Sequence, residues 1–270
     1  MAFEGFFSAL AALIPALFLA AGVYIYVALV RQINARLVEP EGILERRFGW
    51  PEAVLAGFFI LLLLYGLAAS TSRDVTRVQP HDLLNSTALS LGLLVFIASF
   101  LHLRRFDLNS LSGFSKIGFG RAVTTGTILL VAAYPLVVFA EVVTQRLLHR
   151  TLEKQGIIEL FNASGALSQR ILIILIAVVV APLAEEFFFR FFLYGVLRQY
   201  FGRGMGLVTN AILFAAVHAH LPSFAALFVL GICFTIAYEW SGSLLVSMTM
   251  HALFNGLALT ALAFPEVIPQ

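Results

Sequence analysis

The sequence predicts an all-α integral membrane protein: a bundle of about eight transmembrane helices with additional interfacial amphipathic helices. Of its 270 residues, 60% are hydrophobic and only 12% are charged, which is too little charge to cover the surface of a soluble domain. The apolar residues gather in runs of roughly 20 residues, the length that spans a bilayer. Alternating ten-residue strands are absent, and backbone hydrogen bonding in lipid then requires helices.

Turn signals and charges divide residues 1–270 into eight expected spans within a single domain. Trp50-Pro51 is an interfacial aromatic residue followed by a helix-start proline. Leu221-Pro222 reverses the chain, and Pro265 ends the last span. The N-terminus lacks the basic region of a cleavable signal peptide, so the first span is expected to be retained. The expected spans are 6–30, 53–69, 83–103, 122–140, 171–197, 207–219, 224–240 and 244–264.

Two connectors are long enough to have structure of their own. We expect residues 104–121, which mix glycine, serine and basic residues with scattered apolar ones, to lie at the membrane interface. Residues 141–170 are polar enough to leave the membrane, and their leucines and isoleucines suggest an amphipathic helix broken near Gly156. This helix could cover a site, but an interfacial connector is the simpler interpretation.

The charged residues and the single cysteine exclude several classes of partner. Nearly all Lys and Arg residues lie between the spans, so the formal net charge of +2 does not indicate nucleic-acid binding. Cys233 is the only cysteine, which excludes disulfides within the chain. The expected surroundings are the lipid bilayer of a multi-pass protein, in a prokaryotic cell membrane. The sequence leaves the oligomeric state open.

Two acids and a base interrupt one of the most apolar runs of the chain, at Glu185, Glu186 and Arg190. Each charge near the bilayer centre costs roughly 2.5–3.5 kcal/mol on insertion scales, so a functional site is the first hypothesis. Glu186 and Arg190 share a helix face at i,i+4 spacing and are expected to form an ion pair. Glu185 is rotated by about 100° and is left as the free carboxylate. A purely structural charge cluster is the alternative.

Three more polar side chains lie in the following spans. Phe214 precedes His218 by four residues, and His251 precedes Asn255 by four, so each pair shares a helix face. Because the helices are otherwise mostly apolar, these side chains should point into the bundle. Each alone is explained by hydrogen bonds between helices, but together with Glu185 they suggest a catalytic site.

The chemistry that best fits this set is amide hydrolysis. A buried carboxylate can deprotonate water, a histidine can hold that water, and His251 and Asn255 can donate to an oxyanion. Cys233 has no activating partner nearby in the sequence, and Ser243 and Ser247 are of a kind that is ordinary in such helices. Two histidines and two glutamates could instead bind zinc. No His-Glu-x-x-His pairing occurs, however, and Arg190 disfavours a cation, so no metal is expected.

The motifs of the last four spans resemble those of a known family, the CAAX protease and bacteriocin-processing (CPBP or Abi) family. The family includes the Ras-converting CAAX prenyl proteases. The resemblance covers about 171–259. The matching residues are Glu185-Glu186-x-x-x-Arg190, Phe214-x-x-x-His218 and His251-x-x-x-Asn255, supported by Gly231, Tyr238 and Ser241-Gly242-Ser243-Leu244. Residues 1–170 match only as hydrophobic spans, as is usual for this family.

The resemblance implies an eight-helix intramembrane glutamic endopeptidase that needs no metal and no cofactor. Spans 5–8, residues 171–264, would be catalytic, and spans 1–4 with their connectors, residues 1–170, would be the variable part. Glu185 would be the catalytic base, His218 its water-positioning partner, and His251 with Asn255 the oxyanion hole. Glu186, Arg190 and Phe214 would hold the motif in shape. One departure is Glu239, where the family more often has a basic or polar residue, and we expect this acid at a membrane surface.

The resemblance leaves the substrate open. It would be a membrane-associated protein or peptide, processed either in the CAAX manner or at a C-terminus or leader. Some members of the family act as non-proteolytic scaffolds, which is the main alternative. A zinc-dependent membrane protease is a second alternative. An ion or proton transporter would predict two similar halves with broken helices, and the sequence has no such symmetry.

Overall fold

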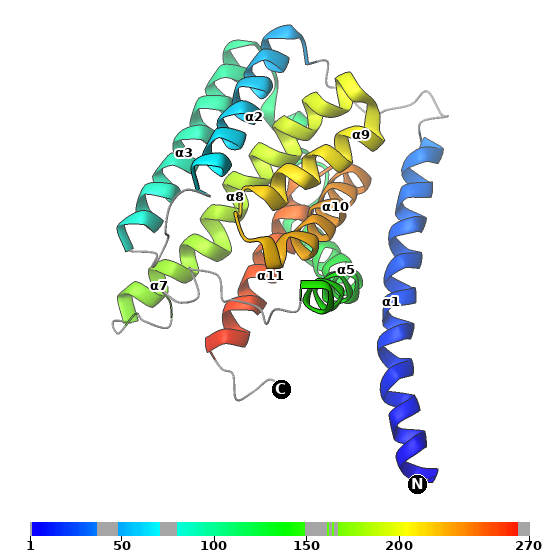
Figure 1. Cartoon of the computed structure of the whole chain (residues 1–270). Coiled ribbons are helices and arrows are strands. Elements are labelled where there is room, and N and C mark those ends of the chain that lie inside the picture. The colour runs from blue at the N-terminus through cyan, green and yellow to red at the C-terminus, as the bar shows by residue number, and fades with distance from the viewer. Residues whose placement is uncertain are drawn as a thin grey trace.

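The computed structural model describes residues 2–36, 48–70, 80–148, 161, 164 and 167–263, and across these ranges it contains helices and no strand (Figure 1). The helices are α1 (Ala2–Arg36), α2 (Trp50–Ser70), α3 (Pro80–Leu103), α4 (Leu108–Ser112), α5 (Phe119–Leu148), α7 (Leu167–Leu175), η1 (Ile176–Val180), α8 (Ala181–Glu186), η2 (Phe187–Leu193), α9 (Tyr194–Ala216), η3 (Leu221–Ser223), α10 (Phe224–Ser241) and α11 (Leu244–Ala263).

Seven helices in the described ranges are long and apolar enough to cross a membrane. The longest, Leu167–Ala216, has 50 residues and contains a break at Gly202, where φ is 77° and ψ is 169°. Only glycine adopts such a conformation readily, so this residue separates the expected fifth and sixth spans. The chain is therefore an integral membrane protein, and the predicted all-α fold with about eight spans is confirmed.

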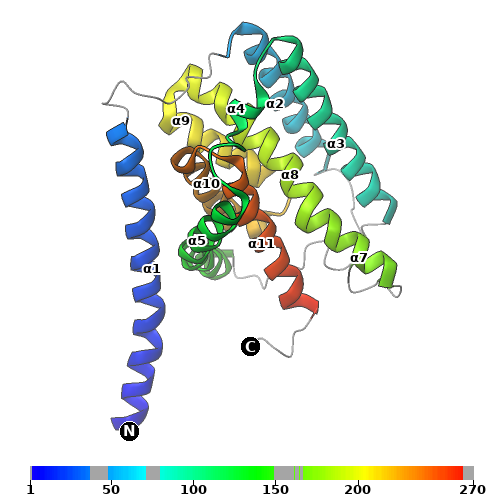
Figure 2. The same ribbon diagram turned by 180° about the vertical axis from the view of Figure 1, so that it is seen from behind.

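The catalytic half expected from the sequence occupies the centre of the bundle. In both views, α1 stands on one flank and the α2–α3 pair on the opposite flank, with α5, α9, α10 and α11 between them (Figures 1 and 2). The side chains with no exposure include Phe191, Phe192, Phe214 and Phe234. The packed core thus lies among η2, α9 and α10, around the motif that carries the buried charges.

One of the two expected connectors differs in part from the structure. Residues 141–148 continue α5 as far as Leu148, because neither glycine nor proline stops the helix there. Most of the amphipathic helix expected over 141–170 lies outside the described residues. Between 104 and 118, the short helix α4 is followed by Gly113, whose φ is +71°. A Cβ atom at Gly113 would lie 1.8 Å from the Gly242 carbonyl oxygen, so this connector packs directly against the turn between α10 and α11.

Glu239, which is expected at a membrane surface, lies near the C-terminal end of α10 and packs inside the protein. Its side chain is 2% exposed and forms ion pairs with Arg198 and Arg203, at 2.9 and 2.8 Å. The Tyr194 hydroxyl donates to the same carboxylate. The break at Gly202 places arginines from either side of it around this acid. Glu239 therefore links α9 to α10 through buried ion pairs. The hydropathy of one span could not reveal these contacts, because the partners lie in another helix.

Candidate active site

The acidic motif lies on α8, a six-residue α-helical segment between two π-helical ones. The Ala181 N–H bonds the Ile176 carbonyl, and the Tyr194 N–H bonds the Phe189 carbonyl, each five residues back. Such widened turns are rare and occur often at functional sites. Pro182, which has no N–H to donate, is the second residue of the α-helical segment. The two widened turns change the directions of the side chains before and after Glu185 and Glu186.

Glu186 and Arg190 form the ion pair that their spacing predicts. Their side chains are fully buried, with 3.3 Å between Arg190 Nε and Glu186 Oε2. The guanidinium carbon lies 4.2 Å from the Phe214 ring centroid and 5.2 Å from that of Phe234. Cation–π attraction to these rings stabilises a desolvated arginine. Arg190 is thus held by one carboxylate and by an aromatic enclosure.

Glu186 also binds His251, which links the first and third motifs. His251 Nδ1 lies 3.0 Å from Glu186 Oε1. Because an ionised carboxylate only accepts hydrogen bonds, Nδ1 is the donor. The other ring nitrogen, Nε2, then lies 3.9 Å from Glu185 Oε2. A single buried acid therefore neutralises Arg190 and fixes the orientation of His251.

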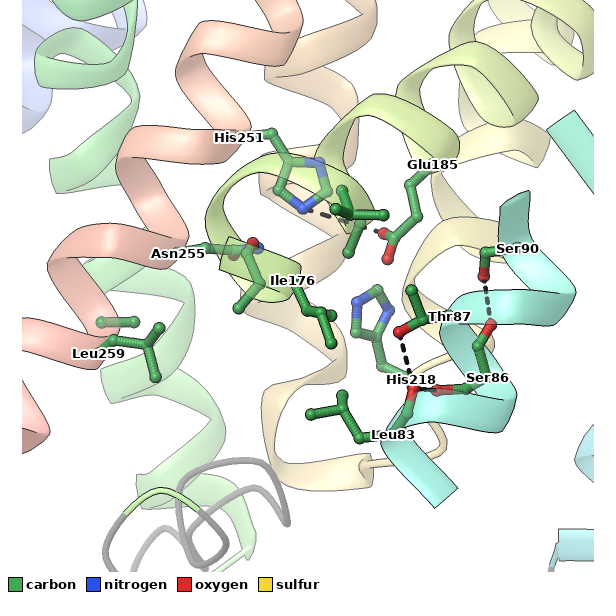
Figure 3. Close-up of a pocket in the computed structure, with 14 residues that line it drawn as sticks. Leu83, Ser86, Thr87, Ser90, Ile176, Glu185, His218, His251, Asn255 and Leu259 are labelled. Carbon is green, nitrogen blue, oxygen red and sulfur yellow. Dashed lines mark hydrogen bonds and ion pairs between the residues drawn. The ribbon is translucent and has the colours of Figure 1, made fainter. Parts of the chain in front are cut away.

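The two adjacent glutamates have different surroundings. The side chain of Glu186 has no exposure, whereas that of Glu185 is 29% exposed. Glu185 lines a cavity of about 290 Å³ together with His218, His251 and Asn255. Figure 3 shows its carboxylate directed towards the two imidazoles. The structure thus brings all four residues expected to be catalytic around one cavity, and leaves Glu186 behind its wall.

His218 follows the end of α9 and faces the same cavity. Its Nδ1 lies 2.8 Å from the Phe214 carbonyl oxygen, one of the carbonyls that a helix C-terminus leaves without a backbone donor. A carbonyl only accepts, so Nδ1 carries the proton, and Nε2 of the neutral ring is an acceptor. The next residue, Ala219, has a φ of 48°. A non-glycine residue in the left-handed region here indicates local backbone strain beside the site.

Asn255 donates one N–H to the Ala177 carbonyl, at 2.8 Å. The π-helical turn explains why this carbonyl is available. In a regular helix its donor would be Ala181 N–H, which instead bonds Ile176, and the next candidate, Pro182, has no N–H. Asn255 therefore joins α11 to the widened turn, and its amide retains a second N–H.

The sequence reasoning missed one wall of the cavity. Leu83, Ser86, Thr87 and Ser90 of α3 line it as well (Figure 3). The signal that could have found them is the hydroxyl spacing on one face of an otherwise apolar span. Within the part of the chain that the structure describes, no cluster of three or more His, Cys, Asp or Glu side chains could hold a metal ion.

Comparison with known proteins gives one match. Residues 167–257 match the family model of the Rce1-like type II CAAX prenyl endopeptidases. These residues include every motif residue that surrounds Glu185, and the match confirms the family resemblance over that segment. No curated protein and no solved structure matches the chain.

Proposed function

We propose that this chain, whose residues 167–257 belong with the Rce1-like CAAX prenyl endopeptidases, is a glutamic intramembrane endopeptidase. The Rce1-like family is a protease family, which supports a hydrolase acting on a protein in the membrane. The observation that carries the glutamic mechanism is the contrast between the two acids. Glu186 forms an ion pair with Arg190 and accepts a hydrogen bond from His251, whereas Glu185 lines the cavity beside two imidazoles.

Glu185 is the general base in this proposal. It takes a proton from a water in the cavity, while His218 Nε2 accepts that water's other hydrogen and orients its lone pair towards the scissile carbonyl. The hydrogen bond from His218 Nδ1 to the Phe214 carbonyl keeps Nε2 available as an acceptor. The protonated Glu185 then gives its proton to the leaving amide nitrogen, so that the proton taken from water ends on the new amine.

His251 and Asn255 stabilise the tetrahedral oxyanion. In its protonated form His251 donates Nδ1–H to Glu186 and presents Nε2–H to the cavity. Asn255 contributes the N–H that is not bound to Ala177. Donors fixed in this way do not reorganise as charge develops, which is the usual source of oxyanion stabilisation. The substrate is a membrane-associated protein or peptide.

The test compares peptide termini in membranes that contain the wild type, Glu185→Gln or Glu141→Gln at matched abundance. Gln is isosteric but cannot act as a base, so we expect Glu185→Gln to lose at least about 100-fold in cleavage. Glu141 is a half-buried acid on α5 outside the cavity lining, and its variant should cleave like the wild type. Full activity in Glu185→Gln would contradict the mechanism.

A further inference from the structure

One wall of the cavity is a row of hydroxyl groups on α3. Ser86, Thr87 and Ser90, called the hydroxyl face below, line the cavity together with Leu83. These residues lie outside the segment that the family match covers, residues 167–257. The proposed catalytic mechanism does not use them.

Each hydroxyl of this face donates its proton within α3. Ser86 and Thr87 both donate to the Leu83 carbonyl, at 2.9 and 2.7 Å, and Ser90 donates to the Ser86 carbonyl at 2.9 Å. A hydroxyl has one proton and two lone pairs. With the protons used in this way, the face presents acceptors to the cavity.

The half of α3 that carries the hydroxyl face is loosely packed. No residue between 81 and 96 is buried, whereas Ile97 and Leu101, further along the helix, have no exposure. Leu89 is 75% exposed on another side of the same half. The hydroxyl face is thus not needed to pack α3 against the bundle, and its side chains are free to contact a ligand.

The dimensions of the hydroxyl face suit an extended peptide. Ser86 and Ser90 are four residues apart, about 6 Å along a helix axis. Successive N–H groups on one side of an extended chain are two residues, or about 6.6 Å, apart. A cavity of about 290 Å³ is at the small end of ligand sites, roughly 300–1,000 Å³, and holds a short segment.

The rest of the lining limits the charge of that segment. It consists of aliphatic side chains, Glu185, two imidazoles and Asn255, and no Lys or Arg is among the described residues that line it. An acidic side chain or a free C-terminal carboxylate there would face Glu185 with no cation to offset it.

We infer that the hydroxyl face of α3 is the substrate-binding wall, and that it accepts backbone N–H groups of an extended, uncharged segment around the scissile bond. This inference rests on the proposed function. It assigns Ser86, Thr87 and Ser90 a positioning role and assigns the N-terminal half of the chain a part in specificity.

The test uses purified protein in lipid vesicles and a library of acetylated, amidated decapeptides with aliphatic, polar and acidic residues, read by mass spectrometry. Cleavage should occur at bonds flanked by uncharged residues and exclude those flanked by Asp or Glu. Equal cleavage of acidic peptides would overturn the inferred substrate class. So would a protein that generates new termini in membranes but cleaves no peptide of the library.

The hydroxyls are tested on the best peptide with Ser86→Ala, Thr87→Val and Ser90→Ala, singly and combined. Each lost hydrogen bond should raise KM by about 2- to 10-fold with little change in kcat. Ser99→Ala is the matched control, because Ser99 is an exposed hydroxyl of α3 outside the cavity lining. Replacing single peptide N–H groups by ester oxygens should weaken binding to the wild type, and much less to the variant lacking the matching hydroxyl.

The inference about the hydroxyl face would be overturned if KM were unchanged in all the variants and the ester substitutions did not weaken binding. That result would indicate that the segment in the cavity offers no N–H donors to α3. If the combined variant does not fold, the single variants and the esters still decide the question. Failure of the inference about the hydroxyl face is distinguishable from failure of the proposed function. In the first case Glu185→Gln is still inactive in membranes; in the second it is as active as the wild type.

Discussion

The two halves of this protein are equally apolar but differ in packing. The spans of α2 and α3 have mean hydropathies of 2.1 and 1.9, and 17% and 11% of their residues are buried. The span of α10 has a mean hydropathy of 2.0, and 56% of it is buried. Hydropathy thus measures partition into lipid, whereas packing depends on small and polar residues that bring helices together. The N-terminal spans mostly face lipid, and the C-terminal ones enclose the site.

Removing one buried acid from each half should give the largest difference in lost stability between the two halves. Glu186→Gln leaves Arg190 fully buried without its partner, and we expect the free energy of unfolding to fall by about 3–5 kcal/mol. In Glu52→Gln the remaining partner, Arg104, is 46% exposed and can still be solvated, so the loss should be about 1 kcal/mol. Unfolding in mixed detergent micelles measures both.

The double variant Glu186→Gln/Arg190→Met is the control for the buried pair. Removing both charges should restore part of the stability, because no uncompensated charge remains. If Glu186→Gln were as stable as the wild type but inactive, the roles assigned to the two adjacent acids would be exchanged.

A pair of glycine substitutions should give an intermediate effect. Gly113→Ala forces a side chain into the left-handed region and against the Gly242 carbonyl, and should cost about 3 kcal/mol. Gly92 lies within α3 with no atom within 4 Å of its virtual Cβ. Gly92→Ala should therefore stabilise the protein slightly, by up to about 1 kcal/mol. A loss at Gly92 equal to that at Gly113 would contradict the loose packing of α3.

The smallest expected effect is at Ala219, next to His218. Its φ of 48° costs an L-residue about 1 kcal/mol that glycine does not pay. Ala219→Gly should therefore raise the thermal midpoint slightly, while the freer backbone holds His218 less firmly and lowers kcat. Thermal unfolding and cleavage of the same preparation measure both. A lower thermal midpoint in Ala219→Gly would contradict the backbone strain assigned to Ala219.

Much of the candidate site could be predicted because it depends on local spacing. The i,i+4 rule pairs Glu186 with Arg190, and the same rule places Phe214 with His218 and His251 with Asn255 on common faces. The spans followed from runs of apolar residues. The end of α5 was missed, since a helix continues past its apolar run wherever nothing stops it. The burial of Glu239 was missed because its partners precede it by more than 30 residues.

By itself, the sequence determined that the chain spans the membrane several times and that one acid of the adjacent pair is neutralised on its own helix. It also placed the other candidate catalytic side chains, His218, His251 and Asn255, within the last four spans. Only the tertiary structure decided which atoms meet. It widened the turns around α8 so that Asn255 binds Ala177, turned His251 onto Glu186, and placed α3 in the lining of the same cavity as Glu185. The two hydrogen bonds join residues 65 and 78 positions apart, and no local periodicity encodes such separations.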